Sequence, residues 1–307
     1  MKLKFKTWLQ KKVRSLNAET SSDLADQFLY VCRTEHLNNT VLASSVPGVS
    51  DEQYCNNEII VSLTTFGRRL YEVYLAIESI MQQTLKPNRI VLWLSDEMKD
   101  IYLPQVLLNQ KKRGLEIRFC KDIRSHTKLI PALKEFPSAA IITIDDDMLY
   151  PFDFVENLIT AHRKNQKMIF CCRMHKMELI GKNRLQEYKK WQHGYDNMEA
   201  SHFNFPLGMG GVLYPPNCFN EEIFNESVFL DICGHADDVW FKAMALLNGV
   251  MAQKVFTHNK NGTDQIRTKF SQYTSLSQIN LGMNMNDKQL KAVFDKYDLY
   301  RKLKTGN

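Results

Sequence analysis

Three consecutive aspartates, Asp145, Asp146 and Asp147, follow the apolar run of residues 140–144. Adjacent carboxylates repel one another, and in a partly buried place they are costly unless a cation balances them. Carboxylate oxygens suit Mn²⁺ or Mg²⁺, which commonly take one or two carboxylates together with phosphate oxygens of a substrate. Because side chains alternate at a strand end, Asp145 and Asp147 are expected to cooperate while Asp146 points elsewhere. An acidic turn before a helix is the alternative, but the apolar run favours the metal site.

A second acidic pair, Asp237 and Asp238, precedes the apolar residues Trp240, Met244 and Leu247, which recur at helical spacing. Aspartates at the start of a helix stabilise it by capping and by interaction with the helix dipole. The same carboxylates are also suited to act as a general base. The two roles are compatible, and the sequence leaves open which aspartate would be the base.

The elements that must position these residues follow an α/β rhythm. Apolar runs predict strands over residues 59–63, 89–94, 115–120 and 140–144. Helical periods lie between them, and this alternation predicts right-handed strand–helix–strand units in a mainly parallel sheet flanked by helices. Ligands of such sheets bind at the carboxyl ends of the strands, which is where the aspartate triplet falls.

The second half of the chain is less regular. We expect a helix over residues 152–165, a strand over 168–173, an irregular stretch over 187–216, a helix over 238–247 and a strand over 250–256. The stretch 187–216 contains the glycine-rich run Gly208-Met209-Gly210-Gly211, whose glycines permit a close backbone approach. The tail from residue 262 is polar.

Three segments together resemble the nucleotide-sugar-binding half of the GT-A glycosyltransferases: the strand 59–65, the segment with Asp122 and Lys128, and the strand that ends in the aspartates. The likeness is greatest to family-2-like bacterial glycosyltransferases of lipopolysaccharide and capsule assembly, and it covers about residues 58–260. It implies a GT-A (Rossmann-like) nucleotide-diphospho-sugar transferase fold. The implied catalytic domain, 58–260, has a nucleotide-sugar-binding half (58–150) and an acceptor half (151–260). A basic helical segment (1–57) would precede it, and a polar and helical tail (261–307) would follow.

The resemblance also implies roles for donor-site residues. Thr64 and Thr65 would line the nucleotide pocket, and Arg68 or Arg69 would reach the phosphates. Asp122 would contact the base, although an ordinary turn residue is the alternative. The donor is also expected to contact Lys128, Asp145 and Asp146.

The remaining implied roles concern the metal ion and the acceptor. Asp147 would bind the Mn²⁺ or Mg²⁺ ion, together with Asp145 and with His258, although a lone histidine is often only structural. Gly210 and Gly211 would bring the backbone close to the sugar and the acceptor. Asp238 or Asp237 would take the proton of the acceptor hydroxyl, as transfer with inversion requires.

The function expected from these features is metal-dependent hexosyl transfer. The donor would be a nucleotide-diphosphate sugar, with UDP as the nucleotide by resemblance. The acceptor would be a saccharide or glycolipid of surface polysaccharide or lipopolysaccharide assembly. One alternative is a sugar-phosphate nucleotidyltransferase, although residues 64–69 hold only one of the glycines that its signature loop needs. The other is a non-catalytic protein that binds a nucleotide sugar or a membrane, which gives no reason for two acidic clusters.

Composition bears on partners and location. The formal charge is +6, and six of the first fourteen residues are basic. Residues 1–16 fit a basic amphipathic helix, either on an anionic membrane surface or packed on the main domain. No basic motif with interleaved aromatics indicates nucleic acid. The seven cysteines include no Cys-x-x-Cys pair, and no run is long and apolar enough to span a bilayer or resemble a secretory signal. We therefore expect a cytoplasmic protein, with the inner face of the plasma membrane as its place if residues 1–16 bind lipid.

Overall fold

The computed structural model describes residues 27–181, 183–258, 265–268 and 284–304. The chain divides into two compact units, residues 1–44 and residues 45–307. The first unit contributes a helix over residues 27–43. The predicted amphipathic helix over residues 1–16, and its predicted membrane contact, lie outside the described residues. None of the described helices combines the length and the apolar character that a membrane crossing requires.

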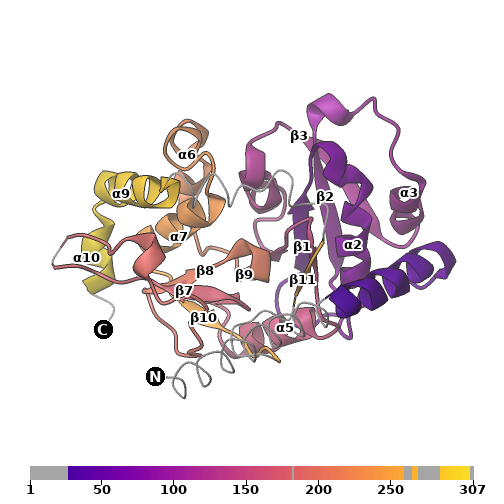
Figure 1. Cartoon of the computed structure of the whole chain (residues 1–307), viewed down its shortest axis with the longest axis horizontal. Helices are drawn as coiled ribbons and strands as arrows, with labels where there is room; N and C mark the ends of the chain where they lie inside the picture. The colour runs from indigo at the N-terminus through magenta and orange to yellow at the C-terminus, as the bar shows by residue number, and fades with distance from the viewer. Residues whose placement is uncertain (1–26, 182, 259–264, 269–283, 305–307) are drawn as a thin grey trace, which may run out of the picture. The chain divides into compact units, whose positions relative to one another are not determined.

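A seven-stranded sheet forms the centre of the second unit, in the order β10-β6-β9-β4-β1-β2-β3 (Figure 1). Its strands are β1 (Ile59–Thr64), β2 (Arg89–Ser95), β3 (Leu115–Cys120), β4 (Ala140–Thr143), β6 (Ile169–Cys171), β9 (Val212–Tyr214) and β10 (Ala252–Lys254). The pairs β1–β2, β1–β4, β2–β3 and β6–β10 are parallel, and β9 runs antiparallel to β4 and β6. The predicted α/β fold with a mainly parallel central sheet is confirmed.

Both faces of this sheet are buried, because successive side chains of a strand point to opposite faces. In β1, Ile59 and Val61 enter a core shared with α2 (Val73–Met81) and α5 (Phe154–Lys164). Ile60 enters the other core, shared with α4 (Ile130–Glu135), α7 (Asp237–Leu247) and α9 (Met285–Tyr297). Helix α3 (Gln105–Lys111) contacts α2 and β3, and the short α6 (Glu226–Ile232) contacts α9. The sheet is thus flanked by helices, as predicted.

Two short ribbons complete the unit. β5 (Met148–Leu149) pairs with β11 (Ile266–Arg267), and β7 (Met174–Lys176) pairs with β8 (Asn204–Pro206), both in antiparallel fashion. The first ribbon begins immediately after the aspartate triplet, and the second follows β6. Both therefore lie in chain segments that border the carboxyl ends of the central strands.

The structure differs from the sequence prediction at two strands. β4 ends at Thr143, so the aspartates lie in a turn between β4 and β5, not on a strand. β9 arises within the stretch 187–216 that was expected to be irregular. A strand of three residues is too short to show a period of two, and its pairing with β4 and β6 depends on distant residues.

The C-terminal helices belong to the second unit. Leu290, Val293 and Phe294 of α9 are buried, as are Leu299 and Leu303 of α10 (Leu299–Lys304). Both helices pack on α7, which Figure 1 shows beside them. The predicted boundaries after residues 57 and 260 do not coincide with the boundary between the two compact units. The predicted assignment of separate functions to these segments stays a prediction.

Candidate active site

The aspartate triplet is split among different partners. Asp146 is buried and accepts hydrogen bonds from Thr65 Oγ1 at 2.6 Å and from Arg69 Nη1 at 2.9 Å. Burial raises the pKa of Asp146 to about 6, although the guanidinium of Arg69 opposes the shift. The carboxylate of Asp146 thus ties the turn to residues that follow β1. Asp147 shares the partner Arg69 with Asp146, so the expected pairing of Asp145 with Asp147 apart from Asp146 stays a prediction.

Lys128 joins the two acidic clusters. Its Nζ lies 2.8 Å from Asp145 Oδ1 and 2.8 Å from Asp237 Oδ2. The side chain of Lys128 is buried, with 7% of its surface exposed. Burial alone would lower the pKa of Lys128, but the carboxylates of Asp145 and Asp237 hold it well above its ordinary value. One ammonium group therefore brings residues that are 92 positions apart in the chain into one site.

The central sheet fixes the position of Lys128. It ends the 3₁₀ helix η3 (Arg124–Lys128), and its carbonyl oxygen accepts a hydrogen bond of 2.6 Å from Ser62 Oγ. Ser62 Oγ in turn accepts from Trp93 Nε1 at 3.0 Å. Ser62 and Trp93 are fully buried on β1 and β2. Two strands of the sheet thus hold the backbone that carries this lysine.

Asp237 and Asp238 begin α7 and differ in their surroundings. Both carboxylate oxygens of Asp238 accept from Gly208 N, at 3.1 and 3.0 Å. Burial, followed by the charge of Asp237, raises the pKa of Asp238 to about 7. Burial also disfavours the ionised form of Asp237, but the ammonium of Lys128 outweighs this and holds its pKa below the ordinary value. Asp237 is thus the ionised partner of Lys128, and Asp238 is the carboxyl that can change its protonation near neutral pH.

The glycine-rich loop lies against these residues as closely as a backbone allows. A Cβ atom on Gly208 would lie 2.6 Å from Lys128 Nζ and 2.7 Å from Asp238 Oδ1. A Cβ atom on Gly210 would lie 2.5 Å from Cβ of Arg173. Gly211 has a φ of 85°, which favours glycine, and its Cβ would meet the ring of Phe154 at 2.3 Å. At Gly210 and Gly211 the backbone thus lies close to protein side chains, and the predicted approach to a sugar and an acceptor stays a prediction.

Asp147 lies beside two guanidinium groups. Its Oδ2 is 3.7 Å from Arg69 Nη1 and 3.8 Å from Arg267 Nε. Its backbone oxygen accepts from Thr268 N at 2.8 Å, so the ribbon β5–β11 brings residues 267 and 268 to the turn. Only 8% of the side-chain surface of Asp147 is exposed.

The other predicted donor residues occupy ordinary structural places. Thr64 Oγ1 donates to the backbone oxygen of Trp93 at 3.0 Å, and Arg68 is exposed. Asp122 Oδ1 accepts from Arg124 N at 2.7 Å, as an ordinary turn residue does. His258 Nε2 lies 2.8 Å from Asp153 Oδ2. Their predicted roles toward base, phosphate and metal stay predictions.

The residues present suit a divalent cation that shares its shell with a substrate. Asp145 and Asp147 supply hard oxygen donors on either side of Asp146, which is bound to Thr65 and Arg69. Within the described residues no group of three or more His, Cys, Asp or Glu side chains is arranged to hold a metal ion by itself. Mn²⁺ or Mg²⁺ would therefore need phosphate oxygens to complete its shell, which is how these ions commonly bind.

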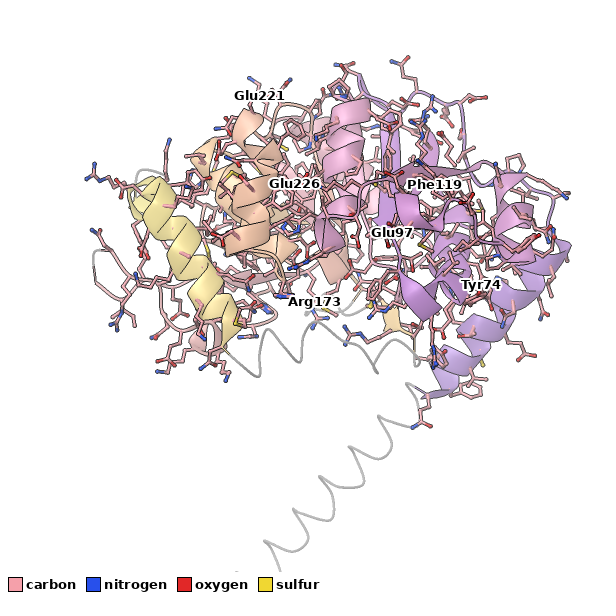
Figure 2. All side chains as sticks on the ribbon, turned by 90° about the horizontal axis from the view of Figure 1, so that it is seen from above. Tyr74, Glu97, Phe119, Arg173, Glu221 and Glu226 are labelled. Carbon is pink, nitrogen blue, oxygen red and sulfur yellow. The ribbon has the colours of Figure 1, made fainter. Side chains whose placement is uncertain are left out.

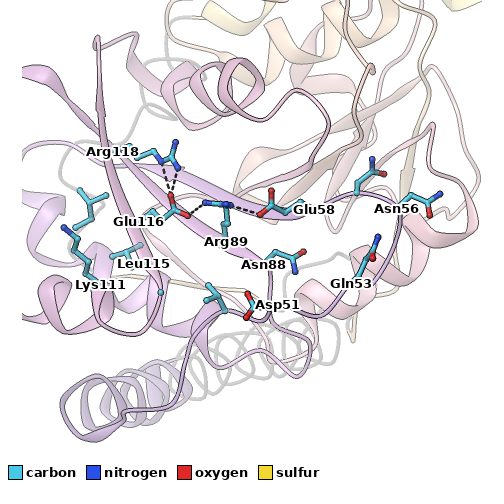
Figure 3. Close-up of a pocket in the computed structure, with 14 residues that line it drawn as sticks. Asp51, Gln53, Asn56, Glu58, Asn88, Arg89, Lys111, Leu115, Glu116 and Arg118 are labelled. Atoms are coloured by element: carbon cyan, nitrogen blue, oxygen red, sulfur yellow. Dashed lines mark hydrogen bonds and ion pairs between the residues drawn. The ribbon is translucent and has the colours of Figure 1, made fainter.

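A groove of about 870 Å³ lies elsewhere (Figure 3). Its lining includes Arg89 and Leu115, the first residues of β2 and β3, so it borders the amino ends of the strands. Among its charged groups, Arg89 pairs with Glu58 at 2.6 Å and with Glu116 at 2.7 Å. The groove thus lies at the opposite ends of these strands from the aspartates, and none of the predicted site residues lines it.

Sequence reasoning missed several residues of the site. Arg173 and Arg267 approach from β6 and β11, and Tyr150 OH accepts from the backbone N of Asp145 at 3.0 Å. No motif marks them. Arg173 follows an apolar strand as Asp122 does, and that position at a carboxyl end is the one signal that could have selected it.

Known proteins are similar to this chain only at low sequence identity. No family model and no curated protein matches the sequence. Among solved structures, the chain is similar to the mannosyltransferase PcManGT from Pyrobaculum calidifontis in complex with GDP-Man and Mn²⁺ (13% identity, TM-score 0.42, 77% of this chain and 64% of that chain). It is also similar to S. aureus TarS 1–349 in complex with UDP (12%, 0.42, 66% and 58%) and to the inositol-1-phosphate CTP transferase from T. maritima (13%, 0.41, 81% and 97%). The chain spans less than two thirds of the first two, and at these TM-scores the likenesses carry no argument about activity.

Proposed function

We propose that this chain is a metal-dependent glycosyltransferase of the GT-A type that transfers a sugar from a nucleoside-diphosphate donor to a hydroxyl group, with inversion. The observation that supports it most directly is Lys128, whose ammonium binds Asp145 and Asp237 at once. Asp145, which we assign to the donor side, and Asp237, the neighbour of the base that we propose, therefore lie close to one another. The resemblance to family-2-like enzymes makes UDP the expected nucleotide. It also makes a saccharide or glycolipid of surface polysaccharide or lipopolysaccharide assembly the expected acceptor.

Each part of the site has a task in this reaction. Asp145 and Asp147 would hold the cation and, through it, the diphosphate. A bound Mn²⁺ or Mg²⁺ supplies charge neutralisation for the leaving diphosphate. Arg69 keeps Asp146 folded back on the turn and keeps positive charge beside Asp147. Lys128 fixes the distance between the donor carboxylates and α7.

Asp238 is the better base of the acidic pair. A general base works best when its pKa lies near the working pH. The pKa of Asp238 is raised to about 7 by burial and by Asp237, whereas Asp237 is bound to Lys128. Asp238 would take the proton of the acceptor hydroxyl, while Gly208 N holds its carboxylate in place.

The test is a binding and product assay on the purified full chain. Thermal-shift measurements with nucleoside diphosphates and nucleotide sugars, with and without Mn²⁺, should show a higher melting temperature for a nucleotide sugar with the ion. Incubation with donor and acceptor should then release a nucleoside diphosphate. Release of pyrophosphate would identify a nucleotidyltransferase instead, and binding without any turnover would support a non-catalytic protein.

Replacing Asp147 by Ala should abolish the metal-dependent part of this binding. The variant loses a carboxylate ligand, so the melting-temperature increase produced by Mn²⁺ with the nucleotide should fall to that of the nucleotide alone. Asp231→Ala is a control, because Asp231 is an exposed aspartate of α6 and has no predicted role at the metal ion. An Asp147→Ala protein with the full Mn²⁺-dependent shift would refute the metal assignment.

The rate should also depend on pH through Asp238. The active base is the ionised carboxylate, so kcat/KM should rise with pH and level off above the pKa of about 7. On a logarithmic plot the acid limb should have a slope of one. An Asp238→Asn protein should lack this limb in its residual activity, whereas a limb that persists unchanged would assign the base to another residue.

A further inference from the structure

Arg173 carries a positive charge that no carboxylate of the described part of the chain balances. It follows β6 closely, and its side chain is partly buried. Its Nη1 donates to the thioether sulfur of Met209 at 3.7 Å, a weak acceptor, and its Nε is shielded from solvent without a hydrogen-bond partner. Within the described residues no carboxylate lies in ion-pair distance of Arg173, although such partners are usual for a guanidinium with little exposure.

A second guanidinium lies near it. Burial, and then the charge of Arg267, lower the pKa of Arg173 below its ordinary value. Arg267 has Asp147 at 3.8 Å, but Asp147 also lies 3.7 Å from Arg69. Asp147 thus faces Arg69 and Arg267, and Arg69 also pairs with Asp146 at 2.9 Å. Among the described residues Arg173 has no carboxylate of its own. Like charges held together in a partly buried place are costly unless an anion joins them.

The position of Arg173 is on the side of the base. The loop 208–211 touches both groups: Gly208 lies against Asp238, and Gly210 lies against Arg173. In Figure 2 Arg173 lies between the ribbons of the amino-terminal half and those of the carboxyl-terminal half.

We propose that Arg173, with Arg267, binds a phosphate group of the acceptor. A guanidinium offers two parallel N–H donors that match two phosphate oxygens, and a pair of guanidiniums balances the charge of a phosphomonoester or phosphodiester. The acceptor would therefore be a phosphate-bearing saccharide or polyol, bound so that its hydroxyl reaches Asp238. This inference rests on the proposed function, because only a transferase has an acceptor. The alternative is that the two arginines bind the diphosphate of the donor.

The experiment measures binding of glycerol 3-phosphate to the full chain by calorimetry, with glycerol as the uncharged control. Arg173→Gln and Arg267→Gln are compared with Arg184→Gln, a matched change at an exposed arginine. The first two should weaken binding by about tenfold or more, as expected for loss of a charged hydrogen bond, and the third should not. Because the side chain of Arg267 is exposed, Arg267→Gln should fold normally. It therefore tests the proposal even if Arg173→Gln folds poorly.

A second arm identifies the source of the phosphate. Saturating UDP with Mn²⁺ should leave glycerol 3-phosphate binding intact, and both variants should bind UDP–Mn²⁺ with wild-type affinity. If UDP–Mn²⁺ displaces glycerol 3-phosphate, or the variants lose UDP affinity equally, the arginines serve the donor and the inference is overturned. Equal binding of glycerol 3-phosphate by all variants would overturn it as well. A chain that binds glycerol 3-phosphate through Arg173 but never binds a nucleotide would refute the proposed function and, with it, the acceptor role.

Discussion

Asp238→Asn is expected to lower kcat by about 10²- to 10⁴-fold, the usual contribution of a general base. The asparagine keeps a carbonyl oxygen that can accept from Gly208 N, as Oδ1 does at 3.1 Å, so the start of α7 should be undisturbed. What the change removes is the group that accepts a proton near neutral pH. The loss should therefore appear in kcat, with the affinity for UDP–Mn²⁺ close to that of the wild type.

The free energy of unfolding of Asp238→Asn distinguishes the loss of a base from a folding defect. The pKa of Asp238 is raised in the folded protein, to about 7, so folding favours its protonated form. Below the ordinary carboxyl pKa this contribution is fully present, and it is lost as the pH rises toward 7. At pH 8 the wild type contains an unfavourable ionised carboxylate beside Asp237, which Asp238→Asn lacks. The variant should thus unfold at pH 8 with a free energy at least equal to that of the wild type.

Two other aspartate variants complete the design. Asp231→Asn changes an exposed aspartate of α6 and should leave both kcat and stability unchanged. Asp237→Asn removes an ionised partner of Lys128 and should lower stability as well as rate. If Asp238→Asn keeps a wild-type kcat while Asp237→Asn loses it, the base is Asp237 and the roles assigned here are reversed.

The central strands were predictable because each is a continuous apolar run. β1, β2 and β3 start within one residue of the predicted positions and end within one residue of them. Such runs are typical of strands buried on both faces, and no partner needs to be known to recognise them. β9 was not predictable in this way, since its three residues become a strand only through pairing with β4 and β6.

The sequence allowed the residues of the candidate site to be selected, but it did not allow their contacts with one another to be predicted. The sequence placed Asp145 and Lys128 near the donor and Asp237 near the acceptor, but it held no sign that one ammonium group binds both carboxylates. That contact depends on η3, on the hydrogen bond of Ser62 with the Lys128 carbonyl, and on the packing of α7. Likewise, the triplet was expected to alternate on a strand, whereas a turn after Thr143 distributes it among partners from three other segments.

The charges of the site explain why a cation and an anion are expected to bind together. Five carboxyl groups, those of Asp145, Asp146, Asp147, Asp237 and Asp238, face the basic groups Lys128, Arg69 and Arg267. A divalent ion alone would compete with Lys128 and Arg69 for these carboxylates, and a diphosphate alone would be repelled by them. Because each compensates the other, binding of the nucleotide and the ion should be cooperative.

Lys128→Met should lower the free energy of unfolding by about 3–5 kcal/mol, the range found when one partner of a buried ion pair is removed. The methionine keeps most of the volume of the lysine, so packing changes little. The cost arises because Asp145 and Asp237 lose a shared ammonium at 2.8 Å, and Asp237 stays buried. Urea unfolding monitored by circular dichroism gives the free energy. Lys112→Met, at an exposed position after α3, is the matched control and should be neutral.

The same variant tests whether Lys128 and the metal ion neutralise the same carboxylates. In the wild type a cation at Asp145 must share that carboxylate with the ammonium of Lys128. In Lys128→Met the competition is gone. In the presence of UDP, Mn²⁺ should therefore raise the melting temperature more than it does in the wild type, and its apparent dissociation constant should fall. Arg113 offers a contrast: it forms a buried ion pair with Glu78 at 2.8 Å, and it lies just before β3, at the amino ends of the strands and not at their carboxyl ends. Arg113→Met should also destabilise the protein, yet its Mn²⁺-dependent shift should equal that of the wild type. Equal Mn²⁺ shifts in wild type, Lys128→Met and Arg113→Met would show that the ion does not bind beside Lys128.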